Sequence, residues 1–236
     1  MWSGPRNIST ALMRAWDSRS DTAVTDEPFY AHYLRTSGAD HPGREQILKA
    51  YPDDWEVIAA GLTGPVPEGR PIWYQKQMAH HLWPEMFGEW LDSLTHAFLI
   101  RDPALVISSF SRVVPDPRME DLGLERQVEL FDEIERRTGE PPPVIDSEDL
   151  LRDPRGVLAA FCECVGVEFD EAMLSWQPGL RPTDGIWAKD WYGSVERSTG
   201  FHPWKEKRVN LEGELETLEE MCRPFYERLA RHRIGH

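Results

Sequence analysis

The sequence predicts an α/β fold with three layers and a mainly parallel sheet, and three observations support this class. Short strand-like stretches alternate with segments of helical periodicity along the whole chain. Several helical segments begin with a Gly-Pro or Asp-Pro step, which is a typical helix start. The 236 residues contain no internal repeat, and α/β domains commonly reach ~250 residues. We therefore predict a single domain over residues 1–236.

The elements follow from apolar patterning. Apolar or alternating residues predict strands at 1–2, 22–26, 72–77, 97–100 and directly after Pro143. Helical spacing predicts helices at 8–18 and 29–34, one after residue 102 and one after Asp153. Apolar residues at helical spacing mark two more, the first at Leu124, Val128, Phe131 and Ile134. The last is marked by Leu211, Leu215, Leu218, Cys222, Phe225 and Leu229. Residues 36–71 are rich in Gly, Pro and Asp around two short helices at 44–50 and 54–61. We expect this stretch to be an insertion on the substrate side.

The first turn of the chain is suited to binding an anion. Residues 3–10 read Ser-Gly-Pro-Arg-Asn-Ile-Ser-Thr, and a helical run follows at once. The turn exposes backbone N–H groups, the helix start adds a positive dipole end, and Arg6 adds a full charge. The segment lacks the Gly-Lys-Ser/Thr ending of a Walker A loop. Taken alone, it is also compatible with an ordinary helix cap.

A second anion-binding segment is predicted around Arg101 and Ser109. The strand at 97–100 ends at Arg101, and open α/β sheets bind their ligands at the carboxyl ends of strands. Ser109 falls on the helical stripe of Leu105 and Val113, where a hydroxyl needs a polar partner. The alternative is a structural ion pair for Arg101 and a hydrogen bond from Ser109 to its own helix.

A third segment, residues 143–167, contains a strand, an acidic stretch and a capped helix. It reads Val-Ile-Asp-Ser-Glu-Asp-Leu before an Asp-Pro step, and the following helix is expected to stop at Gly166. This segment resembles the Tyr-Glu-Asp-Leu region of sulfotransferases, with Ser147 in place of Tyr. The first segment resembles their phosphosulfate loop, Pro-Lys/Arg-x-x-Ser/Thr-Thr. The second resembles the Arg and Ser that bind the 3′-phosphate of their donor, so the resemblance extends from Trp2 to about Tyr226.

The resemblance is to bacterial cytosolic members of this family, and it implies a P-loop-type fold and a reaction. The reaction is transfer of a sulfuryl group from 3′-phosphoadenosine 5′-phosphosulfate (PAPS) to a hydroxyl or amine of a small molecule. PAPS is then the co-substrate, and no metal is implied. The donor-binding residues that it assigns are Pro5, Arg6, Asn7, Ser9 and Thr10 for the 5′-phosphosulfate, and Arg101 and Ser109 for the 3′-phosphate.

Two segments offer the catalytic base. Glu27 follows a strand in Asp-Glu-Pro-Phe-Tyr, which resembles the Lys-Glu-Pro-His-Tyr stretch of heparan-type sulfotransferases, whose Glu is the base. Asp26 stands where those enzymes have Lys. Lys76 occupies the place of the Lys-Thr-His segment of cytosolic sulfotransferases, although His80 and His81 come two or three residues late. We expect Glu27 to be the base, Lys76 to lie near the bridging oxygen and a His to orient the acceptor, with the His pair as rival bases. The non-catalytic alternatives are a helix-start carboxylate and buried imidazoles.

A loop at 183–192 resembles the segment that closes over the donor in sulfotransferases. It offers Trp187, Trp191 and Tyr192 for stacking on adenine and Lys189 for a phosphate. Core packing is the alternative for the aromatic residues.

Composition limits the partners. The formal net charge of −15 argues against nucleic acids and anionic membranes, because both repel an acidic surface. An odd number of Cys, three, suggests neither a zinc site nor a disulfide framework. No apolar stretch approaches membrane-spanning length and no signal peptide is recognisable, so a cytoplasmic location is expected. The expected partner is a small-molecule acceptor, and the sequence carries no code for its identity or for the oligomeric state.

Two other functions compete with sulfotransfer. A P-loop kinase-like phosphotransferase shares the fold, but it needs a Lys-Ser/Thr pair and a Walker B acid for Mg²⁺. A non-catalytic nucleotide-binding protein is favoured if the pocket binds the donor product PAP (3′-phosphoadenosine 5′-phosphate) while Glu27, His80 and His81 point away from it.

Overall fold

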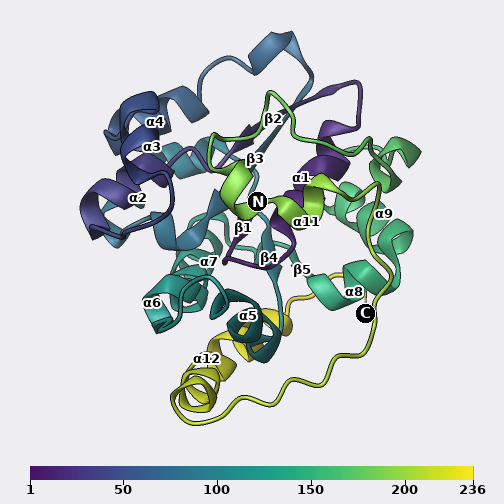
Figure 1. The fold of residues 1–236 in the computed structure, drawn as a ribbon. Helices are drawn as coiled ribbons and strands as arrows, with labels where there is room; N and C mark the ends of the chain where they lie inside the picture. Colours follow the sequence, from purple (N-terminus) through teal and green to yellow (C-terminus); the bar gives the residue numbers. More distant parts are fainter. Residues whose placement is uncertain (236) are drawn as a thin grey trace.

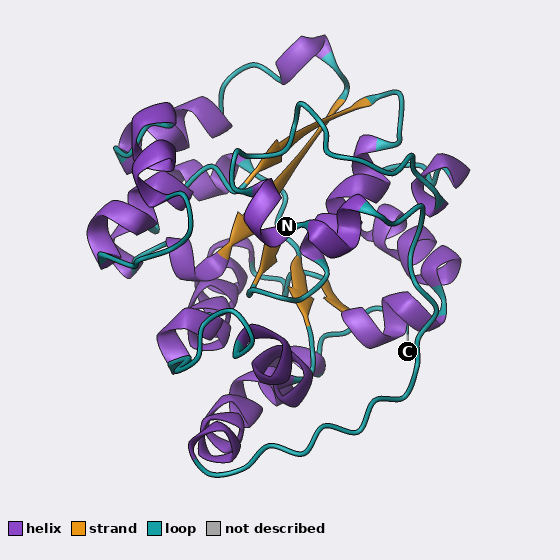
Figure 2. Cartoon of the chain, in the orientation of Figure 1, coloured by secondary structure: helices purple, strands orange, loops and turns teal. Residues whose placement is uncertain are grey.

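The computed structural model describes residues 1–235, in which five strands form one sheet (Figure 1 and Figure 2). The strands are β1 (Trp2–Ser3), β2 (Thr22–Asp26), β3 (Ile72–Met78), β4 (Phe98–Ile100) and β5 (Val144–Asp146). Their order is β2-β3-β1-β4-β5, and every neighbouring pair is parallel. The predicted α/β class with a parallel sheet is confirmed.

Helices connect the strands and cover both faces of the sheet. The α-helices are α1 (Ser9–Asp17), α2 (Tyr30–Ser37), α3 (Arg44–Ala50), α4 (Trp55–Leu62), α5 (Pro103–Phe110), α6 (Met119–Leu122), α7 (Leu124–Thr138), α8 (Ser147–Arg152), α9 (Pro154–Cys164), α10 (Ala188–Trp191), α11 (Gly193–Glu196) and α12 (Glu214–Ala230). The 3₁₀ turns are η1 (Pro67–Gly69), η2 (Ala79–His81), η3 (Pro84–Met86), η4 (Glu89–Ser93) and η5 (Glu171–Leu174).

The helix starts and stops follow the local chemistry of the sequence. Asp102 caps α5 by accepting hydrogen bonds from the backbone N–H groups of Ala104 and Leu105. Asp153 caps α9 in the same way, and Gly166 follows the end of this helix with a φ of 72°, a conformation that favours glycine. These boundaries agree with the predicted caps.

Alternate residues of the strands supply two apolar layers. Leu99 and Ile145 point into a core cluster with residues of α1, α8 and α9. Phe98, Ile100 and Val144 point into a cluster on the other face, with residues of α7 and α12. Figure 1 shows α8 and α9 on one side of the strands and α7 and α12 on the other, so the molecule has the three layers that were predicted.

The central strand β1 has only two residues, and side chains of other elements hold it in place. Gln127 of α7 is fully buried and donates to the backbone carbonyls of Trp2 and Leu99. Asn7 donates to the same Leu99 carbonyl. Gly4 lies so close to α6 that a Cβ there would be 2.5 Å from the carbonyl oxygen of Leu122. The turn after β1 is therefore fixed against the sheet, although its strand is short.

Two helix boundaries differ from the predictions. Helix α5 ends at Phe110, so Val113 lies beyond the helix and is 44% exposed rather than on the buried stripe of Leu105. Helix α12 begins at Glu214 after Gly213, which leaves Leu211 outside it. No helix within residues 1–235 combines the length and the apolar character needed to cross a membrane.

Candidate active site

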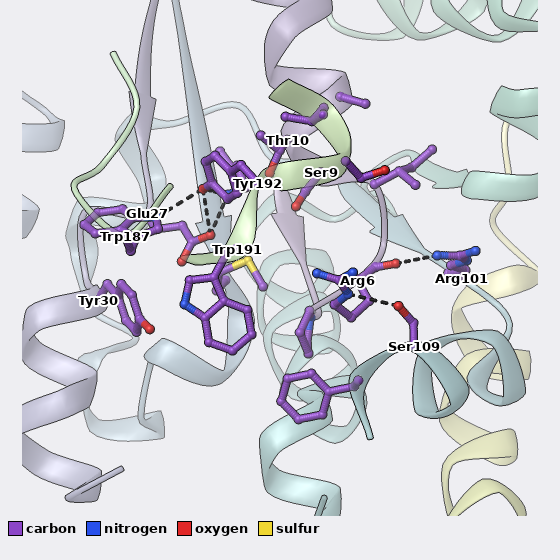
Figure 3. A pocket seen from close by; sticks show the side chains of 18 of the residues that line it. Arg6, Ser9, Thr10, Glu27, Tyr30, Arg101, Ser109, Trp187, Trp191 and Tyr192 are labelled. Atoms are coloured by element: carbon purple, nitrogen blue, oxygen red, sulfur yellow. Dashed lines mark hydrogen bonds and ion pairs between the residues drawn. The ribbon is translucent and has the colours of Figure 1, made fainter. Parts of the chain in front are cut away.

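A cavity of about 400 Å³ opens where β1 to β4 end and the following turns begin. Its lining includes residues that directly follow β1, β2, β3 and β4, among them Arg6, Glu27 and Arg101. This is the edge at which open parallel sheets bind ligands. Figure 3 shows two groups of side chains, with Arg6, Arg101 and Ser109 on one side and Glu27, Tyr30, Trp187 and Tyr192 on the other. We call these the cation end and the aromatic end of the cavity.

The cation end brings together the two predicted anion-binding segments, which lie far apart in the sequence. Arg6 Nε donates to Ser109 Oγ at 3.0 Å, and Arg101 Nη1 donates to the carbonyl oxygen of Arg6 at 2.7 Å. Pro5, Ser9 and Thr10 line the same cavity. The structure therefore places the six residues in one site.

The backbone at this end is arranged for an anion. Arg6 and Ile8 have positive φ values of 62° and 61°, and no side chain caps the start of α1. Left-handed residues alternating along a turn point successive N–H groups into one concavity, and the first N–H groups of a helix have no acceptor within it. Strained backbone of this kind is concentrated at functional sites. Glu27, with a φ of 41°, is a third strained residue of the lining.

The two guanidinium groups of the cation end have no carboxylate partner within residues 1–235. Burial lowers the pKa of Arg101, the neighbouring charge of Arg6 lowers it further, and the charges of Asp102 and Asp146 oppose this. Burial and the charge of Arg112 lower the pKa of Arg6. The buried Nε of Arg101 has no hydrogen-bond partner among the described residues. Two adjacent, partly buried cations, in a protein with an excess of acidic residues, are suited to an anionic ligand.

The second group of site residues centres on Lys76, which is 1% exposed. Its Nζ lies 2.9 Å from Asp26 Oδ1, 2.5 Å from Glu27 Oε1 and 2.6 Å from the hydroxyl of Tyr192. The pairing of β2 with β3 explains the contact, because Asp26 and Lys76 are register partners. Tyr192 also donates to Asp26, and the N–H of Gly185 does the same at 3.0 Å. The carboxylates of β2 thus fix both the lysine and the loop that carries Tyr192.

Glu27 has one carboxylate oxygen, Oε2, without a hydrogen bond to any residue of 1–235. Its hydrogen bonds with described residues use Oε1, and its side chain lines the same cavity as Arg6. Burial raises the pKa of Glu27, the charge of Lys76 opposes this, and the charge of Asp26 adds to the increase. A carboxylate with a raised pKa is a better proton acceptor near neutral pH.

The two predicted histidines line the cavity but are weak bases. Burial lowers the pKa of His80 to about 3, and burial with the neighbouring His80 lowers the pKa of His81. His80 packs against Gly123, where a Cβ would be 3.2 Å from its Nδ1. His81 stacks with Tyr30 and Tyr33, with ring centroids 4.9 and 4.7 Å apart. Of the three candidate bases, the environment favours Glu27.

Some predicted residues lie elsewhere. Asn7 turns its side chain to the carbonyl of Leu99 and is absent from the cavity lining. Lys189 is exposed on α10, also outside the lining. Trp187 and Tyr192 pack beside Tyr30 and the Lys76 cluster, which is the opposite end from Arg101. Trp191 of the same loop packs instead against the cluster that contains Val106, Ile107 and Phe110 of α5, and stacking of the loop on adenine stays a prediction.

The structure adds residues that the sequence analysis did not assign, and it gives Tyr192, which was expected to stack on adenine, a contact with Lys76. Asp26 and Tyr192 complete the Lys76 cluster. Tyr33, His41 and Asp121 line the aromatic end, while Leu151, Phe201 and His202 line the cavity from elements further along the chain. Of these residues, only Asp26 could have been found from the sequence, because it is a carboxylate directly before the candidate base Glu27.

The fold and the site define an α/β protein whose cavity is lined by two arginines at one end and by the carboxylate of Glu27 at the other. The sequence profile of the sulfotransferase domain family matches residues 1–232, and the chain belongs to this family. Two solved sulfotransferase domains share its fold. The domain from the Synechococcus PCC 7002 olefin synthase has 20% identity and a TM-score of 0.51, covering 93% of this chain and 92% of that domain. The domain from the curacin biosynthetic pathway has 16% identity and a TM-score of 0.53, covering 94% of both.

Two curated proteins of Arabidopsis thaliana are similar in sequence. Branched-chain-amino-acid aminotransferase-like protein 1 is 35% identical over 235 residues, and protein 2 of that name is 31% identical over 231 residues. Each alignment covers 98% of this chain but only 41% of the plant protein. The chain thus spans less than half the length of these relatives. The family assignment supports sulfotransfer as the class of reaction.

Proposed function

We propose that the protein transfers a sulfuryl group from PAPS to a hydroxyl or amine of a small molecule. The observation that carries the proposal is the pair of partly buried guanidinium groups that form no ion pair with a carboxylate in the described chain, beside the start of α1, which no side chain caps. PAPS has anionic groups at two separate positions, and the cation end offers two separate sets of donors. Arg6, Ser9 and Thr10 would bind the 5′-phosphosulfate, and Arg101 with Ser109 the 3′-phosphate.

The residues supply what the reaction requires. The acceptor oxygen or nitrogen bonds to sulfur while the bond from sulfur to the bridging phosphate oxygen breaks. The acceptor proton passes to the free oxygen of Glu27, and the products are the sulfated acceptor and PAP. Arg6 and the N–H groups of α1 would stabilise the charge that develops on the leaving phosphate. Lys76 contacts Glu27 and lines the cavity, so it would hold Glu27 in place and lie near the bridging oxygen.

Calorimetry distinguishes this proposal from the two competing functions. We expect PAP to bind in the presence of EDTA with a dissociation constant in the micromolar range, and ATP with Mg²⁺ to bind much more weakly. A preference for ATP with Mg²⁺ would indicate a phosphotransferase. PAP binding without any acceptor-dependent release of PAP from PAPS, across a broad panel of alcohols and amines, would indicate a non-catalytic nucleotide-binding protein.

A further inference from the structure

A second cavity, of about 370 Å³, lies at the edge of the sheet where the strands begin, opposite the candidate active site. Its lining includes residues 72–75 at the start of β3 and residues 93–97 directly before β4. Strand β1 lies between these two strands but has only two residues (Figure 1). The cavity therefore occupies the place in the sheet where β1 would continue alongside the start of β3. We call it the strand groove.

Strand β3 has a free backbone edge along the strand groove. It pairs with β1 only at the last two of its seven residues, whereas it pairs with β2 from Ile72 onwards. The N–H of Gln77 faces β1 and donates to the carbonyl of Met1. Because the backbone groups of alternate residues point to the same side of a strand, the N–H groups of Trp73 and Gln75 face the groove. Within residues 1–235 the sheet offers these two groups no strand partner. Such an edge is a template for a further strand.

The strand groove has apolar walls on both faces of the sheet. Trp16 and Phe161 line it from the core cluster on one face, and Leu62 lines it from the cluster on the other. Strands in the interior of a parallel sheet are covered in this way. At the inner end of the groove the amine of Met1 donates to the carbonyl of Gln75 at 3.0 Å. Burial lowers the pKa of this amine to about 5, so its surroundings suit an uncharged peptide N–H better than an ammonium group.

From this geometry we infer that the strand groove is the seat of an extended, apolar segment of about four residues that is joined to the amino end of β1 and runs parallel to β3. The groove is continuous with β1, so an occupant in register with β3 is joined to Met1 rather than ending beside it. Its residue two before Met1 would donate to the carbonyl of Trp73 and accept from the N–H of Gln75. By the alternation of strand side chains, that residue shares the face of Met1, which packs in the cluster of Trp16.

Two extended proteins of equal length test the inference. One carries Met-Val-Ile-Val-Ile before Met1, and the control carries Met-Gly-Ser-Gly-Ser. We expect the apolar extension to raise the midpoint of thermal unfolding by at least about 5 °C over the control, because it buries apolar side chains and pairs free N–H groups. In hydrogen exchange the amides of Trp73 and Gln75 should become protected in the apolar variant alone. The amide of Tyr74, which faces β2, should be equally protected in both. Equal midpoints, a higher midpoint without this protection, or an apolar variant that fails to fold where the control folds would overturn the inference.

A single charge in the apolar extension tests the register and the source of the strand. Asp at the residue two before Met1 would lie against the cluster of Trp16, so it should cancel most of the rise in the midpoint. Asp inserted directly after the new starting Met, beyond the start of β3, should leave the rise intact. Equal effects of the two changes would contradict the register. If a free peptide of the apolar sequence protects Trp73 and Gln75 in the unextended protein while the fused extension does not, the groove takes a strand of a partner and the inference is wrong.

Discussion

The cation end and the aromatic end of the cavity treat their charged side chains in different ways. At the aromatic end Lys76 is paired with two carboxylates, those of Asp26 and Glu27, so its charge has partners within the protein. At the cation end Arg6 and Arg101 lie side by side, partly buried, and form no ion pair with a carboxylate in residues 1–235. A paired lysine is suited to positioning its neighbours, whereas unpaired cations are suited to an anionic ligand. On the proposed function, the first end would carry the chemistry and the second would bind the donor.

Removing the proposed base should have the largest effect. Glu27→Gln preserves the shape of the side chain but cannot accept the acceptor proton, so turnover should fall by ~10²–10⁴. Affinity for PAP, measured by calorimetry, should change little because Glu27 lies away from Arg101. A larger loss of turnover in His80→Ala or His81→Ala than in Glu27→Gln would move the role of base to the histidines.

The buried ion pair between Arg14 and Asp184 should contribute strongly to the stability of the fold. Arg14 on α1 binds Asp184 through two contacts, of 2.5 and 2.6 Å, and the side chains are 0% and 3% exposed. Asp184→Asn leaves a buried guanidinium without its counterion, so we expect a loss of about 3–5 kcal/mol in the free energy of unfolding. Denaturant unfolding measures this directly.

A matched control is available at the surface. Asp132 pairs with Arg228 and is 51% exposed, so Asp132→Asn should cost less than about 1 kcal/mol. Equal losses in the two variants would show that the Arg14–Asp184 pair contributes no more to stability than an exposed ion pair does.

The pH dependence of turnover separates the candidate bases. The pKa of Glu27 is raised above its ordinary value of 4.5, and a base must be deprotonated to act. Turnover should therefore be lost as pH falls through that raised pKa, by about tenfold per pH unit below it. This acidic limb of the pH–turnover profile should disappear in Glu27→Gln. Because the pKa of His80 is lowered to about 3, a limb that persists in this variant near the ordinary histidine value of 6.5 would contradict the assignment.

Substitution of Lys189 should have the smallest effect on the affinity for PAP. This side chain is exposed and lies outside the cavity lining, so Lys189→Ala should change PAP affinity by no more than about twofold, within the ±0.5 kcal/mol typical of surface substitutions. A tenfold loss in a PAP titration would show that α10 reaches the donor.

The sequence predicted the sheet, the caps and the anion-binding segments because these depend on local signals. Apolar runs locate β4 and β5, and the Asp-Pro steps locate the starts of α5 and α9. The balance of charge around Lys76 could not be predicted, because it depends on the register of β2 against β3 and on Tyr192 returning from far along the chain.

The aromatic end was less predictable for the same reason. Tyr33, His41 and Asp121 come from three segments with no shared motif, and only the packing of α2 and α6 around η2 brings them together. The loop at 183–192 was expected over adenine from the family pattern, and its attachment to Asp26 through Gly185 and Tyr192 had no signal in the sequence.

The most direct test of the two-ended site is a PAP titration of Arg101→Ala in EDTA. The variant loses a charge-assisted contact worth ~1.5–3 kcal/mol, so PAP should bind about tenfold to a hundredfold more weakly than to the wild type. Arg155→Ala, which removes an exposed guanidinium paired with Glu171, serves as the control and should bind PAP normally. If Arg101→Ala folds and binds PAP as tightly as the wild type, the cation end is not the donor site.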